Sequence, residues 1–356
     1  MRAESLEFLR SIVETPSPSG FEEEVAQLYR DYVRPYADEV TTDVLGNVIA
    51  AINPDAEVRI MLSGHMDEIG FIIHYISEYG LLHFGPVGGN DGGVAVGQRV
   101  WVRNAGQMIP GVVGYKAVHL MEPSELGLKP ELSNLWIDIG ASSKEEAEKL
   151  VSLGASATHD NGFQLLNENY AAGRAFDNKA GVLIIADALR LLREEGGLDP
   201  NVGVFAVATT QEEIGSRGAK TAAFAINPRT ALAVDMGQAK DYPGIVKRRV
   251  GEFALGKGPG ISRGANTNPK VFNMLRRAAA DAAIEVQVTV TPGQSPTDER
   301  QLQVTRGGIA SGLVEVPLRY MHTPSEVLCL DDVDAASRLM AQFCRLVRAD
   351  TDFVPG

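Results

Sequence analysis

The sequence predicts an α/β fold, in which a mixed sheet is covered by helices on both faces and a small β-rich domain is inserted between the two halves. The chain has 356 residues, which is more than one compact core usually fills. Apolar strand-like runs alternate with helical segments near both ends, whereas residues 71–164 contain short β-like runs separated by Gly-rich turns. We therefore predict one domain formed by residues 1–70 plus 165–356, and an inserted domain formed by residues 71–164. A single α/β domain with long loops is the alternative.

The elements before the insertion follow from their apolar patterns. A helix is predicted over residues 4–14, where "TPSPSG" ends it, and a second helix over residues 21–34, which Pro35 ends. The runs "NVIAAI" and "VRIMLSG" are predicted strands. The second run is nearly all apolar, as is typical of a strand that is covered on both faces.

The insertion is predicted to carry five strands and one helix. The helix is expected over residues 143–153, because Ser143 and Glu146 match a capping box, in which each side chain bonds the backbone amide of the other residue. The strand-like runs are "GFIIHYI", "GLLHFG", "GQRVWV", "MIPGVVG" and "NLWIDIG".

Helices and strands alternate again after the insertion. Helices are predicted over residues 179–193 and 268–281 and in "GSRGAKTAAFAI". Strands are predicted in "VGVFAVATT", "TALAVD", "EVQVTV", "GGIASGLVEV" and "LRYMH". A closing helix has one apolar face, formed by Val333, Ala336, Met340, Phe343 and Val347.

Composition excludes several classes of protein. The chain has 33 Lys and Arg against 46 Asp and Glu, a formal net charge of −13, which argues against nucleic-acid binding. No segment has about 18 uninterrupted apolar residues, so we expect no membrane span. The two cysteines, Cys329 and Cys344, lack metal-binding spacing, and the N-terminus lacks the apolar core of a signal peptide. We therefore expect reduced thiols and a cytoplasmic location.

Side chains of metal-binding types follow the ends of several predicted strands. Ligands collect at the carboxyl ends of strands in open α/β sheets, so these side chains are expected to converge. They are His65 and Asp67 after "RIMLSG", Glu212 and Glu213 after "VGVFAVATTQ", Asp235 after "TALAV" and His322 after "EVPLRYM", with Asp177 and Asn178 at the entrance of the helix 179–193.

Each of these residues has an ordinary structural interpretation when it is taken alone. Asp177 can be a helix cap, Glu212 and Glu213 solvated loop charges, Asp235 a turn residue and His322 a structural histidine. Their shared position favours a metal site, because so many buried carboxylates would repel one another without cations.

The ligand types narrow the choice of metal. Imidazole nitrogen and carboxylate oxygen suit Zn²⁺, Co²⁺ or Mn²⁺ better than Ca²⁺ or Mg²⁺. Two histidines and three carboxylates are too many for one open catalytic ion, but they suit two ions that share a bridging carboxylate. Asp67 is expected to orient His65, because residues i and i+2 of an extended chain point the same way. One of Glu212 and Glu213 must be free to move the proton of the attacking water.

Five motifs in order, "GHMDEIGF", "GRAFDNKAG", "TTQEEIGSRGA", "AVDMG" and "RYMHTPSE", resemble those of the TET-type, or glutamyl, aminopeptidases, a family of dinuclear metallopeptidases. The resemblance implies that Asp177 bridges two divalent ions and that Glu212 is the general base and acid. Zinc is the preferred metal for both positions, and cobalt or manganese are the alternatives. It also implies that Asp67 orients His65. The implied ligands are His65, Asp177 and Asp235 for one ion, and Asp177, Glu213 and His322 for the other.

The resemblance also implies an architecture and a substrate. It predicts an α/β/α peptidase domain with an inserted β-barrel-like domain that makes contacts in a tetrahedral homododecamer or acts as a lid. Short peptides with a free N-terminus are the implied substrates, and the Asp177–Asn178 peptide bond is expected to be cis. The departures from the family pattern are Lys179, where arginine is more usual, and His159 with Asp160 in the loop "THDNGF".

Three rival functions stay open at this stage. A dimetal amidase or deacylase would act on N-acyl amino acids or peptides, and an endoglucanase would need two opposed carboxyl groups and no metal. A scaffold without activity would have lost a ligand or the base, yet all are present. The preferred N-terminal residue is not specified, and Arg263 is expected to be an exposed loop charge. The histidines of the insertion are expected to be structural or exposed, with His119 the first candidate to reach the cleft.

Overall fold

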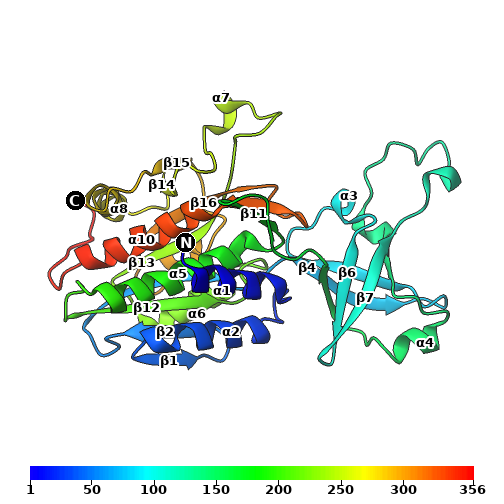
Figure 1. Cartoon of the computed structure of the whole chain (residues 1–356), viewed down its shortest axis with the longest axis horizontal. Helices are drawn as coiled ribbons and strands as arrows, with labels where there is room; N and C mark the ends of the chain where they lie inside the picture. The colour runs from blue at the N-terminus through cyan, green and yellow to red at the C-terminus, as the bar shows by residue number, and fades with distance from the viewer.

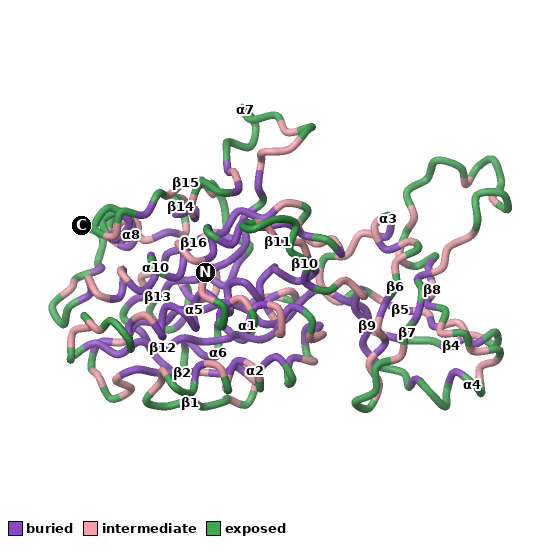
Figure 2. Tube along the Cα trace, viewed as in Figure 1, coloured by how far each residue is buried: buried purple, intermediate pink, exposed green.

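The computed structural model describes residues 1–356, and its two parts have separate hydrophobic cores. The large α/β domain has a core of 54 residues on one face of its sheet and a core of 13 residues on the other, and the insertion has a core of 15 residues. Figure 1 shows the two parts at opposite ends of the long axis, with the insertion in cyan. The central strands of the large sheet, such as β3 (Val58–His65), β12 (Val202–Thr209) and β13 (Thr230–Gln238), are buried along most of their length, whereas the outer loops of the insertion are exposed (Figure 2).

The large domain is built on an 11-stranded mixed sheet. Its central strands β12, β3, β13 and β16 are parallel to one another, and the strands on either side of this group, β2 and β17, are antiparallel to it. In spatial order the strands are β1 (Glu39–Thr42), β2 (Val48–Ile52), β12 (Val202–Thr209), β3 (Val58–His65), β13 (Thr230–Gln238), β16 (Ala310–Arg319), β17 (Glu326–Cys329), β11 (Tyr170–Gly173) and β10 (Gln164–Leu165), with β14 (Gly260–Gly264) and β15 (Gln287–Thr291) paired beside β16.

Helices cover both faces of this sheet, which confirms the predicted α/β/α architecture. One face is covered by α1 (Ala3–Glu14), α2 (Glu23–Val33), α5 (Phe176–Glu195), α8 (Pro269–Asp281) and α10 (Leu330–Leu346). The other face is covered by α6 (Arg217–Ile226) and the short α9 (Glu299–Gln303). A small helix, α7 (Lys247–Val250), lies in an exposed loop. No helix combines the length and apolar character that crossing a bilayer requires.

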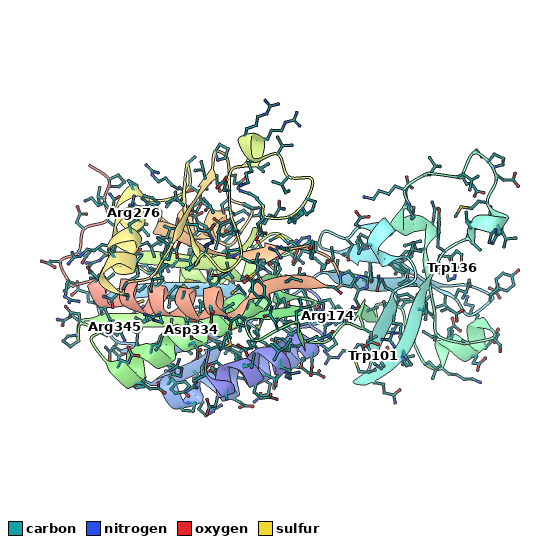
Figure 3. The ribbon with its side chains drawn as sticks, turned by 45° about the horizontal axis from the view of Figure 1, so that its top comes forward. Trp101, Trp136, Arg174, Arg276, Asp334 and Arg345 are labelled. Carbon is teal, nitrogen blue, oxygen red and sulfur yellow. The ribbon has the colours of Figure 1, made fainter.

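The insertion forms a closed barrel of antiparallel strands. The strands, in order around the barrel, are β4 (Gly70–Ile76), β5 (Leu82–Val87), β8 (Trp136–Asp138), β7 (Gln107–Gly114), β6 (Arg99–Asn104) and β9 (Ser156–His159). Short helices connect them: α3 (Gly92–Ala95), α4 (Lys144–Glu148) and the 3-10 turns Val118–Leu120 and Leu132–Asn134. Figure 3 shows Trp101 and Trp136 within this barrel.

Several elements differ from the sequence prediction. The helix of the insertion is α4, Lys144–Glu148, and the chain turns after it instead of continuing to residue 153. Ser143 caps it by accepting a bond from the Glu146 amide, but the Glu146 carboxylate accepts from the Ser142 amide rather than from Ser143. The runs "GGIASGLVEV" and "LRYMH" contribute to one continuous strand, β16, which ends at Arg319.

The register of the parallel strands sets the position of the functional edge. Thr209 at the end of β12 lies opposite His65 at the end of β3. Strand β13 continues past the predicted end to Gln238, because it stays paired with β16 as far as Leu318. Asp235 therefore lies within β13 rather than after it, opposite Glu315 of β16.

Candidate metal centre

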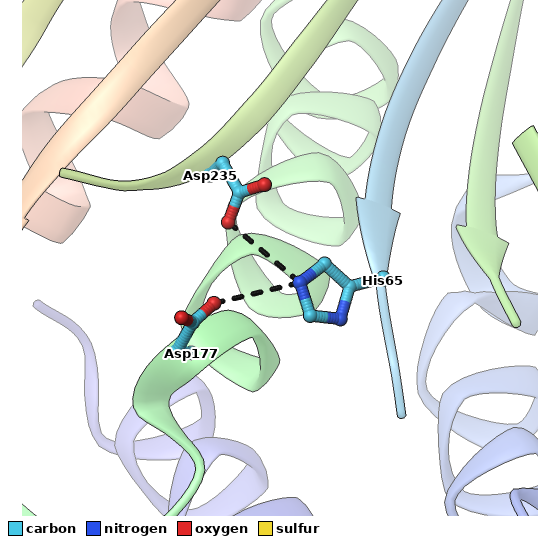
Figure 4. Close-up of side chains that lie close together, drawn as sticks. All are labelled: His65, Asp177 and Asp235. Atoms are coloured by element: carbon cyan, nitrogen blue, oxygen red, sulfur yellow. Dashed lines mark ion pairs between the residues drawn. The ribbon is translucent and has the colours of Figure 1, made fainter. Parts of the chain in front are cut away.

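The structure brings all the predicted site residues to the carboxyl edge of the parallel strands. His65 is the last residue of β3, Asp235 lies in β13, and the two glutamates follow β12. His322 follows β16 in a turn, and Asp177 lies in the first turn of α5. Figure 4 shows His65, Asp177 and Asp235 pointing toward one another from three different elements.

A first group of possible metal ligands is formed by His65, Asp177 and Asp235. The His65 Nε2 atom lies 3.4 Å from Asp177 Oδ1 and 3.7 Å from Asp235 Oδ1. All three side chains are buried, and the Glu212 carboxylate lies beside them, with its Oε2 atom 3.9 Å from His65 Nε2. One ligand atom from each residue lies within 4.8 Å of the others, which is compatible with a single shared ion.

A second group is formed by Asp177, Glu213 and His322. The His322 Nε2 atom lies 3.4 Å from Asp177 Oδ2 and 3.5 Å from Glu213 Oε1. Asp177 thus directs one carboxylate oxygen to each group, which is the arrangement that a bridging ligand needs.

Hydrogen bonds fix the orientation of the two imidazole rings. The His65 Nδ1 atom lies 3.1 Å from the Asp67 backbone oxygen and 3.4 Å from its carboxylate. The His322 Nδ1 atom lies 3.0 Å from the backbone oxygen of Gly89. In both rings Nε2 is the nitrogen turned toward the carboxylates. Gly89 belongs to the insertion, so the insertion reaches the site through a backbone carbonyl, whereas His119 is exposed and lies outside the cleft.

The Asp67 carboxylate holds the loop that carries both glutamates. It is buried and accepts bonds from the backbone amides of Glu212 (2.9 Å) and Glu213 (3.1 Å). It also accepts a bond from the Ser19 hydroxyl at 2.6 Å. Its hydrogen bonds are therefore with this loop and with Ser19, in addition to the position beside His65 that the sequence predicted.

The Glu212 side chain is held by a serine from the following turn. Its Oε1 accepts a 2.7 Å bond from the Ser216 hydroxyl, and its Oε2 lies 3.9 Å from His65 Nε2. Burial raises the pKa of the Glu212 carboxyl above its usual value. Sequence reasoning missed Ser216, although the four-residue spacing within "EEIGS" was an available signal.

Glu326 is a second residue that sequence reasoning did not assign. Its buried carboxylate accepts bonds from the backbone amides of His322 (2.9 Å) and Asp177 (3.2 Å). It therefore ties together two of the three chain segments that supply the second group of ligands, those of Asp177 and His322. Its presence in the motif "RYMHTPSE" was the available signal.

The entrance of α5 is anchored to strand β13. The Asp177–Asn178 peptide bond is cis, as the family resemblance implied. The Asn178 side chain donates a 2.8 Å bond to the Val234 backbone oxygen and accepts a 3.1 Å bond from the Gly181 amide. These bonds hold Asp177 close to Asp235.

A buried ion-pair cluster supports the site from the side where the two domains meet. Glu68 pairs with Arg174 and accepts a 2.9 Å bond from Lys179, and these cations hold its pKa at about 2 against the effect of burial. Lys179 also donates a 2.6 Å bond to the Thr15 backbone oxygen. Figure 3 shows Arg174 near the junction between sheet and barrel. Lys179, which the sequence resemblance marked as a departure from the family pattern, is therefore part of this ion-pair cluster.

The donor set fits divalent metal ions. Burial raises the pKa of Asp235 well above its usual value and that of Glu213 to about 7, so the ionised carboxylates are unfavourable without nearby cations. The site offers imidazole nitrogens and carboxylate oxygens and no thiolate, and both cysteines are buried free thiols elsewhere. This set suits borderline ions such as Zn²⁺, Co²⁺ and Mn²⁺.

Comparisons with known proteins agree over nearly the whole chain. The family model described as M42 glutamyl aminopeptidase matches residues 46–339. The lysyl aminopeptidase of Pyrococcus furiosus is 34% identical over 353 residues, which are 98% of this chain and 99% of that protein. A TET aminopeptidase structure from a marine sediment archaeon of the Thaumarchaeota has a TM-score of 0.93 at 34% identity, covering 98% of this chain and 97% of the other. The Pyrococcus horikoshii TET1 peptidase, described as assembling into a tetrahedron or a large octahedral shell, has a TM-score of 0.86 at 30% identity, covering 96% and 100%.

The fold and these matches define an aminopeptidase, a hydrolase of peptide bonds. The chain belongs to the M42 glutamyl aminopeptidase family and has the fold of the TET aminopeptidases. The resemblance seen in the five sequence motifs is thereby confirmed. The family is named for glutamyl residues and one relative for lysyl residues, so these similarities indicate no single preferred N-terminal residue.

Proposed function

We propose that the chain removes N-terminal residues from short peptides, using two divalent metal ions and Glu212 as the general base and acid. The observation that carries this proposal is the pair of ligand groups that share Asp177 and lie beside the Glu212 carboxylate. The proposed ligands are His65, Asp177 and Asp235 for one ion, and Asp177, Glu213 and His322 for the other, with zinc the first choice of metal and cobalt or manganese the next.

Glu212 moves the proton in this proposal. Its carboxylate takes a proton from the attacking water and later returns that proton to the leaving amine. The Ser216 hydroxyl occupies Oε1, so Oε2 is the oxygen directed to the reacting water. Asp67 orients His65 and fixes the amides of Glu212 and Glu213, which limits the motion of the base. Bound ions would supply the remaining chemistry by making a water more acidic and by polarising the peptide carbonyl.

The side chains around the site can select substrates that have a free N-terminal amine. Carboxylates in the cleft are suited to bind a free α-amino group, which an N-acylated substrate lacks.

We assign the reaction to the cytoplasm, because both cysteines are free thiols. A dimetal amidase or deacylase is the second candidate, but no observation on the site favours it.

We propose that the insertion, residues 71–164, serves as an oligomerisation or lid domain of the peptidase domain formed by residues 1–70 and 165–356. Its outer loop exposes four apolar side chains that have no cover within one chain: Val118, Leu120, Leu126 and Leu128. A relative assembles into a tetrahedron or octahedral shell, and we propose a homododecamer here. Mass photometry gives the number of subunits directly, and a monomer at micromolar concentration would contradict the proposal.

The activity is tested with free and N-acetylated aminoacyl-p-nitroanilides, on chelated enzyme with and without added Zn²⁺, Co²⁺ or Mn²⁺. We expect metal-dependent release from free amines only. Glu212→Gln should lower kcat by about a hundredfold or more, because a positioned base contributes that much. The exposed Glu168→Gln is the matched control and should retain activity. Hydrolysis of acetylated substrates would move the assignment to a deacylase, and indifference to chelation would refute the two-metal reaction.

A further inference from the structure

A single arginine lines the candidate catalytic cleft. The cleft has a volume of about 370 Å³, and its walls include the two histidines and four of the carboxylates described above. Arg300 is the one Lys or Arg side chain among the lining residues, and it comes from α9. The inference drawn from Arg300 rests on the proposed function and concerns how that site selects its substrate.

The backbone of Arg300 is held in place by its surroundings. Its amide donates a 3.2 Å bond to the Thr297 backbone oxygen. Leu302, two residues later, is fully buried in the core between α6 and the sheet. Helix α9 is therefore anchored by Leu302 to this core, and the Arg300 side chain extends from the helix to line the cleft.

The Arg300 guanidinium has no partner within the chain. Its Nε is buried without a hydrogen-bond acceptor, whereas Arg174 pairs with Glu68 and Arg319 binds Asp241 through two bonds of 2.8 and 2.7 Å. Asp298 lies only two residues away, yet its carboxylate accepts a bond from the Thr209 hydroxyl instead. A buried donor without an acceptor is costly, so a ligand that supplies an acceptor gains affinity there.

Space is available beside the guanidinium. A Cβ built on Gly215 would lie 4.0 Å from Arg300 Nη2 and within 4 Å of nothing else. Gly215 belongs to the turn that follows Glu213, so the guanidinium lies next to the loop that carries the base and a ligand. A group bound by Arg300 is therefore close to the peptide bond that would be cleaved.

The partner that fits this position is a carboxylate. The guanidinium presents a planar fork of N–H donors that matches a carboxylate in a two-bond geometry. The carboxylates of the cleft are taken up by the two ligand groups and by Ser216. We propose that Arg300 is a specificity-determining residue that pairs with a carboxylate of the peptide substrate. Two sources have this chemistry: an acidic side chain on the N-terminal residue, and the C-terminal carboxylate of a dipeptide.

Arg263 provides the matched control. Its side chain is exposed, as the sequence predicted, although it lies in strand β14 rather than in a loop, and its guanidinium is 5.7 Å from the Phe272 ring centroid. Its Nη1 donates a 3.3 Å bond to the Gly264 backbone oxygen, and it does not line the cleft. Arg263→Gln removes the same charge from the same domain without changing the cleft.

The experiment compares kcat/KM for matched substrate pairs in the metal-loaded full-length enzyme. Glutamyl- and glutaminyl-p-nitroanilide differ only in the side-chain carboxylate, and Ala-Ala and Ala-Ala-amide differ only in the C-terminal carboxylate. We expect at least one pair to favour the acidic member in the wild type by about tenfold or more. That ratio should fall toward one in Arg300→Gln, stay partly in Arg300→Lys and remain at the wild-type value in Arg263→Gln. Metal content and thermal midpoint verify that each variant is folded.

The outcomes separate this inference from the proposed function. Collapse of the glutamyl ratio identifies the side chain as the source, and collapse of the dipeptide ratio identifies the C-terminus. Equal rates within both pairs in the wild type, or an equal loss for all substrates in Arg300→Gln, would overturn the inference while leaving the aminopeptidase assignment intact. The same loss of ratio in Arg263→Gln would also overturn it. If the wild type hydrolyses no free-amine substrate, the proposed function fails and the inference fails with it.

Discussion

The carboxyl edge of the large sheet and the inserted barrel contain the same kinds of side chain but arrange them differently. At the sheet edge, His65 and His322 lie within 3.4 Å of a shared aspartate. In the insertion, His74 and His119 are exposed, and His159 is buried with its Nδ1 lacking a hydrogen-bond partner. Burial lowers the pKa of His159 to about 4, so it is a neutral ring rather than a partner for carboxylates.

The difference follows from strand direction. Parallel strands all end at the same edge, so residues that follow each strand meet in one place. Antiparallel strands of a barrel end alternately at opposite rims, which separates the residues that follow them. The two regions therefore show that a histidine can join a metal site when it follows a strand that ends at the common edge of a parallel sheet. Its neighbours in the sequence do not decide this.

The largest effect is expected from the residue shared by both ligand groups. Asp177→Ala should abolish detectable aminopeptidase activity, because it removes a ligand from each group at once. Asp160→Ala is the control from the junction with the insertion, where the carboxylate accepts a 2.6 Å bond from the Trp101 ring. It should retain most of the activity. A near-normal kcat in Asp177→Ala would contradict the claim that the sheet edge, unlike the insertion, holds a catalytic metal site.

A smaller effect is expected when the base is kept but its support is removed. Ser216→Ala should lower kcat by about tenfold, because the hydroxyl bond to Glu212 Oε1 is charge-assisted and fixes the carboxylate. KM should change less than kcat, since Ser216 is a positioning residue that acts through Glu212. The exposed Ser152→Ala in the insertion is the control. A change confined to KM would contradict the positioning role.

The smallest effect concerns a buried carboxyl that has no metal beside it. Burial raises the pKa of Glu299 to about 7 from 4.5, so the folded state holds the proton more tightly than the unfolded state. Below about pH 4.5 the Glu299 carboxyl is protonated in both states and its effect on the free energy of unfolding is constant. As the pH rises above this value the carboxyl lowers the free energy of unfolding, and the full loss is reached above about pH 7. Glu299→Gln should therefore increase the free energy of unfolding more at pH 8 than at pH 5. The difference between the two increases is expected to be about 1–3 kcal/mol.

Denaturant unfolding at the two pH values, at a fixed metal concentration, measures this effect. The exposed Glu57→Gln is the control and should show no difference between them. A stabilisation by Glu299→Gln that is the same at pH 5 and pH 8 would contradict the assignment of a raised pKa. It would also show that buried carboxyls in this domain tolerate charge without cations.

The sequence was sufficient to predict the α/β/α layers and the residues that meet at the sheet edge. Apolar runs marked the central strands, and the polar residue after each run marked the common edge. Ser216, Glu326 and Arg300 were not assigned, because their contacts join segments that only the packed fold brings together. The end of β13 was misplaced for a related reason: pairing with β16 extends the strand beyond its apolar run.

The central claim is that two metal ions share Asp177 at the sheet edge, and the metal content of purified protein tests it most directly. After removal of metal and reloading with Zn²⁺, elemental analysis of the wild type should give two ions per chain. His322→Ala should give one, because it removes a ligand from the second group only, and His74→Ala in the insertion should still give two. Fewer than two ions in the wild type, or a count that His322→Ala leaves unchanged, would contradict the account.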